Sequence, residues 1–133
     1  MYQQYLILFA EITRNKKSQF LVDDELFLIS SPKEGVWVIT AQIARFEEKL
    51  PSKVAECLFS CSLISMQTTG PQLHKEKNHV VLRHVCKTPS GYIEFKSLMK
   101  SLAFQAKEWR ETLRELGRQS PSRITTNQLF FAY

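Results

Sequence analysis

From Tyr92 to Leu116 the sequence reads YIEFKSLMKSLAFQAKEWRETLREL. Its apolar residues recur at intervals of three and four, which places them on one face of an α-helix. They are Phe95, Leu98, Met99, Leu102, Ala106, Trp109, Leu113 and Leu116. Gly117 follows as a typical C-terminal stop. At about 1.5 Å per residue such a helix is roughly 37 Å long, which exceeds the roughly 28 Å diameter of so small a domain. The segment therefore predicts one long amphipathic helix.

Shorter elements are predicted upstream of this helix. A broad apolar face predicts a first helix over Tyr2–Thr13, and a three-four rhythm after Pro51 predicts a second over Ser52–Met66. Runs rich in β-forming residues, separated by turn residues, predict strands over Gln19–Val22, Glu25–Ser30, Val36–Ala44, Gln72–His74 and Asn78–Cys86. The predicted fold is α+β, in the order helix, three-strand antiparallel meander, helix, two-strand hairpin and long C-terminal helix.

The composition is that of one small domain. The chain has 133 residues, of which 44% are hydrophobic, and only 4 Gly and 5 Pro. We expect a domain over residues 1–117 and a tail over 118–133, which turns apolar at Leu129–Tyr133 and is flexible or bound to a partner. Three cysteines are few and odd in number, which favours reduced thiols in the cytoplasm. No apolar run reaches the about 18 residues that a membrane span needs, and no signal peptide is apparent.

The residue pattern does not favour an enzyme or a metal site. Cys57, Cys61, His74 and His79 have the spacing of a zinc finger, but the cysteines fall on a predicted helix and the histidines in predicted strands, the reverse of a finger. No nucleophile elbow, catalytic cysteine signature or phosphate-binding glycine loop occurs. We expect no catalytic residue, no metal and no cofactor.

Positive charge is concentrated in the second half of the chain. The net charge is +5. Residues 1–66 carry 7 basic and 8 acidic side chains, and residues 67–133 carry 11 basic and 5 acidic ones. Lys107, Arg110 and Arg114 flank the apolar stripe of the long helix; they form either a solvated face or a docking surface for an acidic partner. Direct binding of nucleic acid is not favoured, because no DNA-reading fold is recognisable.

The order of elements resembles that of the class I type III secretion chaperones, the CesT-like family. The resemblance covers about residues 1–116. It is carried by Val54–Ile64 leading to Thr69–Leu73, by the strand Val80–Leu82, and by Ala106–Leu113, which is similar to the family ending Ala-Glu-x-Trp-Arg-x-x-Leu. A chlamydial member is one hypothesis within this resemblance.

The resemblance implies a bacterial cytoplasmic chaperone that holds the N-terminal region of a secreted effector in extended form. Strand addition would supply affinity and apolar grooves would supply discrimination. The strand Leu26–Ile29 is apolar on both faces, which indicates that something covers its second face. The implied effector-binding residues are Leu6, Phe9, Leu26, Phe27, Leu28, Ile29, Trp37 and Ile39. The implied dimer interface contains Leu58, Phe59, Leu63, Val81, Arg83 and Val85. Each of these residues could equally belong to the core.

Two features depart from the family pattern. Members of the family are typically acidic, and the tail of this chain has no clear counterpart in them. The isoelectric point is about 9.2, so two identical copies would repel each other. We therefore expect a heterodimer with a second, acidic chaperone rather than a homodimer. The alternative function is a transcription regulator that acts through RNA polymerase or its sigma factor, with Lys107, Arg110 and Arg114 as the docking residues. Both functions could reside in one protein.

Overall fold

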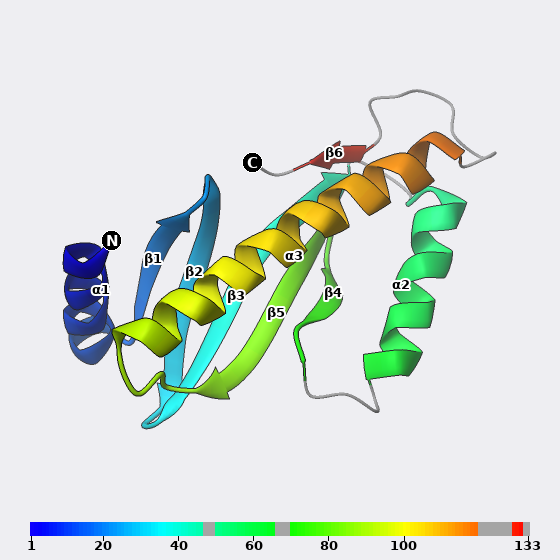
Figure 1. Cartoon of the computed structure of the whole chain (residues 1–133). Coiled ribbons are helices and arrows are strands. Elements are labelled where there is room, and N and C mark those ends of the chain that lie inside the picture. Colours follow the sequence, from blue (N-terminus) through cyan, green and yellow to red (C-terminus); the bar gives the residue numbers. More distant parts are fainter. Residues whose placement is uncertain (47–49, 66–69, 120–128, 132–133) are drawn as a thin grey trace.

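The computed structural model describes residues 1–46, 50–65, 70–119 and 129–131. The elements follow the order α1, three strands, α2, two strands, α3 and a short last strand (Figure 1). Their bounds are α1 Tyr2–Asn15, β1 Lys17–Val22, β2 Glu25–Lys33, β3 Val36–Phe46, α2 Ser52–Ser65, β4 Gln72–Glu76, β5 His79–Lys87, α3 Tyr92–Gln119 and β6 Leu129–Phe131. The α+β prediction is confirmed, with the predicted elements in the predicted order.

The described strands form one antiparallel sheet with the order β1-β2-β3-β5-β4, and β6 pairs with β3 beside this path. The long helix α3 crosses one face of this sheet, while α1 lies beside β1 and α2 beside β4 (Figure 1). No described element packs across the opposite face. The sheet therefore has a helix-covered inner face and an open outer face.

Local sequence explains how the first strands are connected. Lys16 ends α1 in the left-handed conformation, and its amide bonds back to the carbonyl of Ile12. Asp23 and Asp24 both have positive φ, as a tight two-residue hairpin turn requires, so β1 folds back directly onto β2. Gly35, with φ of 80°, adopts a positive φ in the turn between β2 and β3, which glycine does without steric strain.

The core lies between the inner face of the sheet and α3, and α1 closes one end. Alternate residues of β1, β2 and β3 are buried, as expected for strands with one covered face. An aromatic cluster joins α1, β3 and α3, because Tyr5 and Trp37 both contact Phe95, and Phe9 contacts Trp37. This cluster holds α1 in position beside the sheet.

Two details of the C-terminal part differ from the prediction. Helix α3 continues past Gly117 to Gln119, so the helix and not a tail contains residue 118. Residues 129–131 form β6 on the sheet, whereas we expected them to belong to a tail that is flexible or bound to a partner. The rest of the predicted tail, residues 120–128 and 132–133, lies outside the described residues.

Candidate functional site

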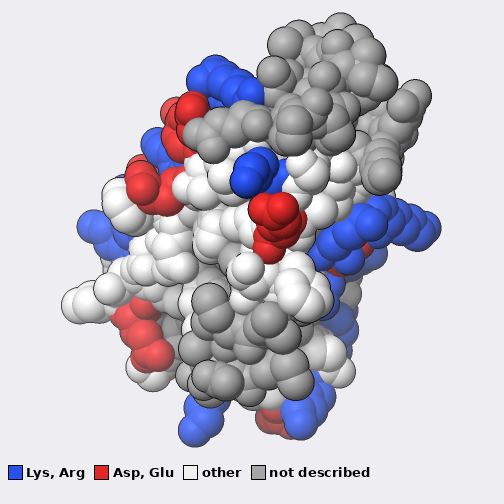
Figure 2. Space-filling view, turned by 90° about the vertical axis from the view of Figure 1, so that its right-hand side faces the viewer, with Lys and Arg blue, Asp and Glu red and all other residues white. Residues whose placement is uncertain are grey.

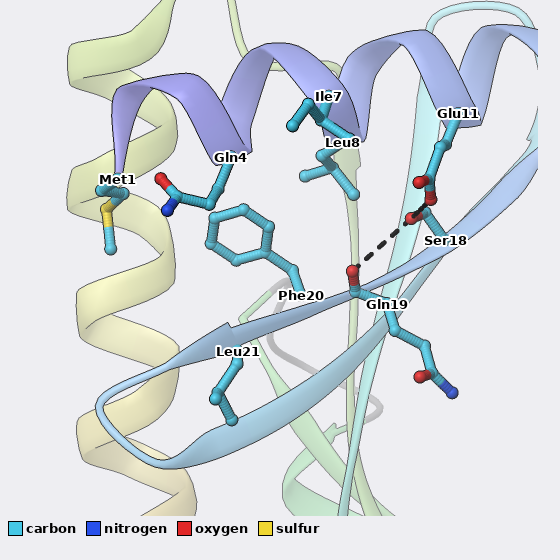
Figure 3. Close-up of a pocket in the computed structure, with 9 residues that line it drawn as sticks. All are labelled: Met1, Gln4, Ile7, Leu8, Glu11, Ser18, Gln19, Phe20 and Leu21. Carbon is cyan, nitrogen blue, oxygen red and sulfur yellow. Dashed lines mark hydrogen bonds between the residues drawn. The ribbon is translucent and has the colours of Figure 1, made fainter.

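A groove runs between α1 and β1, with a volume of about 500 Å³ (Figure 3). Helix α1 contributes one wall and β1 the other. The lining residues are Met1, Gln4, Ile7, Leu8, Glu11, Ser18, Gln19, Phe20 and Leu21. Leu8 and Phe20 are buried, whereas Ile7 and Leu21 are about 60% exposed, at 59% and 63%. The groove thus presents apolar side chains to solvent.

The backbone of β1 faces this groove with an open edge. The carbonyl of Lys16 accepts a hydrogen bond from the amide of Ser31 on β2, at 2.8 Å. Because successive residues of a strand direct their backbone groups to opposite sides, Ser18, Phe20 and Val22 bond toward β2. Lys17, Gln19 and Leu21 then direct their amides and carbonyls away from the sheet. No described strand occupies that side of β1, so this edge can accept an additional strand.

A polar contact fixes one end of the groove. The hydroxyl of Ser18 donates to the carboxylate of Glu11, which links β1 to α1, and it also lies 3.5 Å from the carbonyl of Gln19 (Figure 3). The remaining lining is largely apolar. The two walls are therefore held at a defined separation by side chains from both elements.

The outer face of the sheet carries a second hollow, of about 350 Å³, whose lining includes Gln19, Leu26 and Leu28. One cross-strand row runs from Gln19 on β1 through Leu28, Thr40 and Arg83 to Gln72 on β4. Leu26 and Leu28 are 48% and 46% exposed. Gln19 lines both hollows, so the groove beside α1 and the outer sheet face are continuous at β1.

The structure separates the proposed effector-binding residues into buried, half-buried and exposed ones. Phe27, Ile29, Trp37 and Ile39 point inward and are at most 2% exposed, so they belong to the core and not to a surface. Phe9 is half-buried against the same core. Leu6, Leu26 and Leu28 are exposed and remain candidates for binding. The correction follows from strand pleating, which sends neighbouring side chains of β2 to opposite faces.

The proposed dimer residues do not form one buried cluster. Phe59 on α2 and Val85 on β5 are exposed, Leu58 is half-buried against the core, and Val81 is buried. Arg83 is bound by both carboxylate oxygens of Glu76, at 2.7 and 3.1 Å. The side chain of Leu63 lies outside the described residues. Phe59 and Val85 are thus the exposed apolar members of this set.

The proposed regulatory residues also differ in their surroundings. Arg110 is buried and paired with Glu25, so it cannot serve as an exposed docking residue. Arg114 pairs with Glu111 at 2.6 Å, and Lys107 is exposed. Seen from the right-hand side of Figure 1, Lys and Arg are interspersed with Asp and Glu among the described residues (Figure 2). This view shows no uniform basic surface.

Titratable groups near the start of α3 have shifted pKa values with local causes. Burial raises the pKa of the Cys86 thiol, and nearby Glu94 adds to this effect. Burial lowers the pKa of His84.

Within the described ranges, no three or more His, Cys, Asp or Glu residues gather as a metal site would require. No helix in the same ranges is long and apolar enough to cross a membrane.

None of the nine residues that line the groove was among the predicted effector-binding residues, and the predicted residues Leu6 and Phe9 do not line it. The exposed apolar residues missed in this way are Ile7 and Leu21. Ile7 lies beside the predicted apolar face of α1, and Leu21 lies on the side of β1 that is opposite its buried residues. Neither residue gave a usable signal, because its exposure is known only from the structure and single exposed apolar residues are common on protein surfaces. The open edge of β1 had no signal in the sequence, since strand order depends on tertiary pairing.

Solved structures of similar fold identify the architecture. A chain of the HopA1-SchA chaperone-effector complex aligns with a TM-score of 0.57 and 15% identity, covering 80% of this chain and 93% of that one. A chain of the heterodimeric complex ExoU-SpcU from the type III secretion system of Pseudomonas aeruginosa aligns with a TM-score of 0.58 and 13% identity, covering 87% and 97%. The protein has a type III secretion chaperone fold. No protein-family model and no curated protein matches the sequence.

Proposed function

We propose that this protein is a non-enzymatic type III secretion chaperone that binds the N-terminal region of a secreted effector in extended form. The observation that carries the proposal is the open edge of β1 beside the apolar groove of α1. The solved complexes of similar fold support it, because one is a chaperone-effector complex and the other is a heterodimeric complex from a type III secretion system. The transcription-regulator alternative has no support from these comparisons.

Binding at this edge combines two kinds of recognition. An added strand would bond to the backbone groups of Lys17, Gln19 and Leu21, which gives affinity for many sequences. Its side chains alternate in direction, so one set would contact the wall with Ile7 and Leu8 and the other set would approach Leu28 on the outer face. Apolar residues at alternate effector positions therefore provide discrimination.

A matched pair of helix substitutions tests the groove. Ile7→Glu places a charge in the groove, whereas Phe104→Glu makes the same change at an exposed apolar position of α3 that does not line it. The effector is first identified by affinity purification from the native cell, and its N-terminal fragment is then co-expressed with each variant. We expect Ile7→Glu to lower affinity at least about tenfold, by burying an unpaired charge. Phe104→Glu should bind normally; equal binding by both folded variants would reject the site.

We also propose that the form which holds the effector is a heterodimer with an acidic chaperone. The exposed apolar residues Phe59 and Val85 suit a partner surface. Lys75, Lys77 and Lys87, on or between the strands of the hairpin that precedes α3, are exposed as well. An acidic partner of the same fold would cover the apolar residues and turn like-charge repulsion into attraction.

Co-expression followed by light scattering tests the heterodimer. We expect the chain to self-associate or to be poorly soluble alone, and to form a one-to-one complex with an acidic chaperone recovered from the native cell. Phe59→Ala should weaken that complex, because apolar anchors contribute much of interface affinity. A stable homodimer that binds the effector without any acidic chaperone would exclude the heterodimer while leaving the groove proposal intact.

A further inference from the structure

The two edges of β3 are paired to different extents. On one side, β5 runs along it from Val36 to Arg45. On the other side, β2 pairs only as far as Ala41, which is opposite Phe27, and β2 itself begins only two residues before Phe27, at Glu25 after the Asp23–Asp24 turn. The last part of β3 thus extends past the β1–β2 hairpin. This leaves a strand position, the β3 slot, beside Ala44–Phe46.

The chain's own segment β6 fills the β3 slot. Ala44, Arg45 and Phe46 pair with Phe131, Phe130 and Leu129, respectively, in antiparallel register. Strand β6 also contacts α3, and it lies at the end of β3 beside the C-terminal part of this helix (Figure 1). The segment is three residues long and belongs to the apolar run Leu129–Tyr133.

Backbone geometry identifies which residues face the β3 slot. The amide of Phe46 donates to the carbonyl of Asn78, at 3.0 Å, on the side of the β4–β5 hairpin. The preceding residue, Arg45, therefore directs its amide and carbonyl to the opposite side, toward β6. Its register partner is Phe130. Arg45 and Phe130 are thus the residues that exchange backbone bonds across the slot.

The β3 slot lies in an apolar setting that favours occupation by a strand. Ala44 and Phe46 are buried, and Lys75 lies over the ring of Phe46 at 5.8 Å from its centroid. Backbone groups beside buried residues need partners, because an unpaired amide or carbonyl away from water is costly. A three-residue strand, however, forms few bonds and is held mainly by its tether to the same chain.

We propose that the β3 slot is a second strand-acceptor site, which takes an extended apolar peptide and which β6 occupies until such a peptide displaces it. A short tether gives β6 an effective concentration on the order of millimolar, so a short competitor binds poorly while β6 is in place. A longer apolar segment gains additional contacts and displaces it. The slot is separate from the β1 groove, and neither proposal depends on the other.

The test uses the full chain and two proline variants of β6. Phe130→Pro removes the amide that faces Arg45, whereas Leu129→Pro removes an amide that faces away from β3. The probe is a fluorescein-labelled peptide of residues 127–133, NQLFFAY, and binding is followed by fluorescence anisotropy. We expect Phe130→Pro to bind the probe at least about tenfold more tightly than the wild type, because the tethered competitor is weakened. Leu129→Pro should behave as the wild type does.

Hydrogen exchange provides an independent measurement on the same three proteins. The Arg45 amide should exchange at least about tenfold faster in Phe130→Pro, while the Phe46 amide, which bonds to Asn78, should keep its protection. Unchanged protection of Arg45 would overturn the proposal, as would equal probe binding by all three folded proteins. A Phe130→Pro dimer that excludes the probe would also overturn it, since the slot would then take a second copy of the chain.

Discussion

Arg110 on α3 and Glu25 at the start of β2 form a buried ion pair, with side chains only 8% and 4% exposed. Arg110 Nη2 also donates to the carbonyl oxygen of Gln42 on β3, at 2.8 Å. One guanidinium thus fastens the long helix to two adjacent strands. The residue that looks like part of a basic docking surface in the sequence is instead a link within the fold.

Removal of this guanidinium should destabilise the protein strongly. Arg110→Ala leaves the Glu25 carboxylate buried without its partner, so we expect the free energy of unfolding to fall by about 3–5 kcal/mol. Arg114→Ala is the control, because Arg114 and its partner Glu111 are much more exposed, at 32% and 69%, and it should cost no more than about 1 kcal/mol. Urea denaturation of both variants measures the difference. Similar losses would contradict the linking role of Arg110.

The two faces of β2 should respond differently to truncation. Phe27→Ala creates a cavity in the core and should lower the free energy of unfolding by about 3–5 kcal/mol. Leu28→Ala, one residue further along, changes an exposed side chain. It should change the free energy of unfolding by only about 0.5 kcal/mol. Equilibrium unfolding gives both values. Loss of effector binding by a folded Leu28→Ala protein would add the outer face to the binding surface.

Proline at the open edge of β1 should block strand addition without unfolding the sheet. Gln19→Pro removes an amide that points away from β2, a position where edge strands tolerate proline. We expect the thermal midpoint to change little and effector affinity to fall at least about tenfold. Gln19→Ala keeps the amide and serves as the control in the same titration. If the alanine and proline variants bound equally well, backbone pairing at β1 would play no part.

The hydrogen bonds between Ser90 and Glu94 at the start of α3 should stabilise the folded state less in acid. Side-chain and backbone hydrogen bonds from Ser90 lower the pKa of Glu94 below its ordinary value, despite a small opposing effect of desolvation. A carboxyl whose pKa is lowered on folding stabilises the folded state above its unfolded pKa, and this stabilisation is lost as pH falls through the folded pKa. The thermal midpoint of the wild type should therefore drop below about pH 4.3 more steeply than that of Glu94→Gln. Parallel curves for the two proteins would exclude this contribution.

The sequence by itself determined the described elements other than β6, and their order. The three-four spacing from Phe95 to Leu116 predicted α3, and the turn residues Asp23–Asp24 predicted the first hairpin, because both signals depend on neighbouring residues in the chain. Boundaries moved by one to three residues, as with β2, which extends to Lys33. The resemblance that these elements carry agrees with the chaperone fold of the solved complexes.

Only the tertiary structure decided which side chains are available for binding. Leu26–Ile29 is apolar throughout, so no local pattern distinguishes Phe27, which points to α3, from Leu28, which points to solvent. The same holds for Arg110, whose burial requires Glu25 to arrive from far away in the sequence. The open edge of β1 and the pairing of β6 with β3 follow from strand order. Strand order is set by pairing between distant segments, and the spacing of residues along one segment does not encode it.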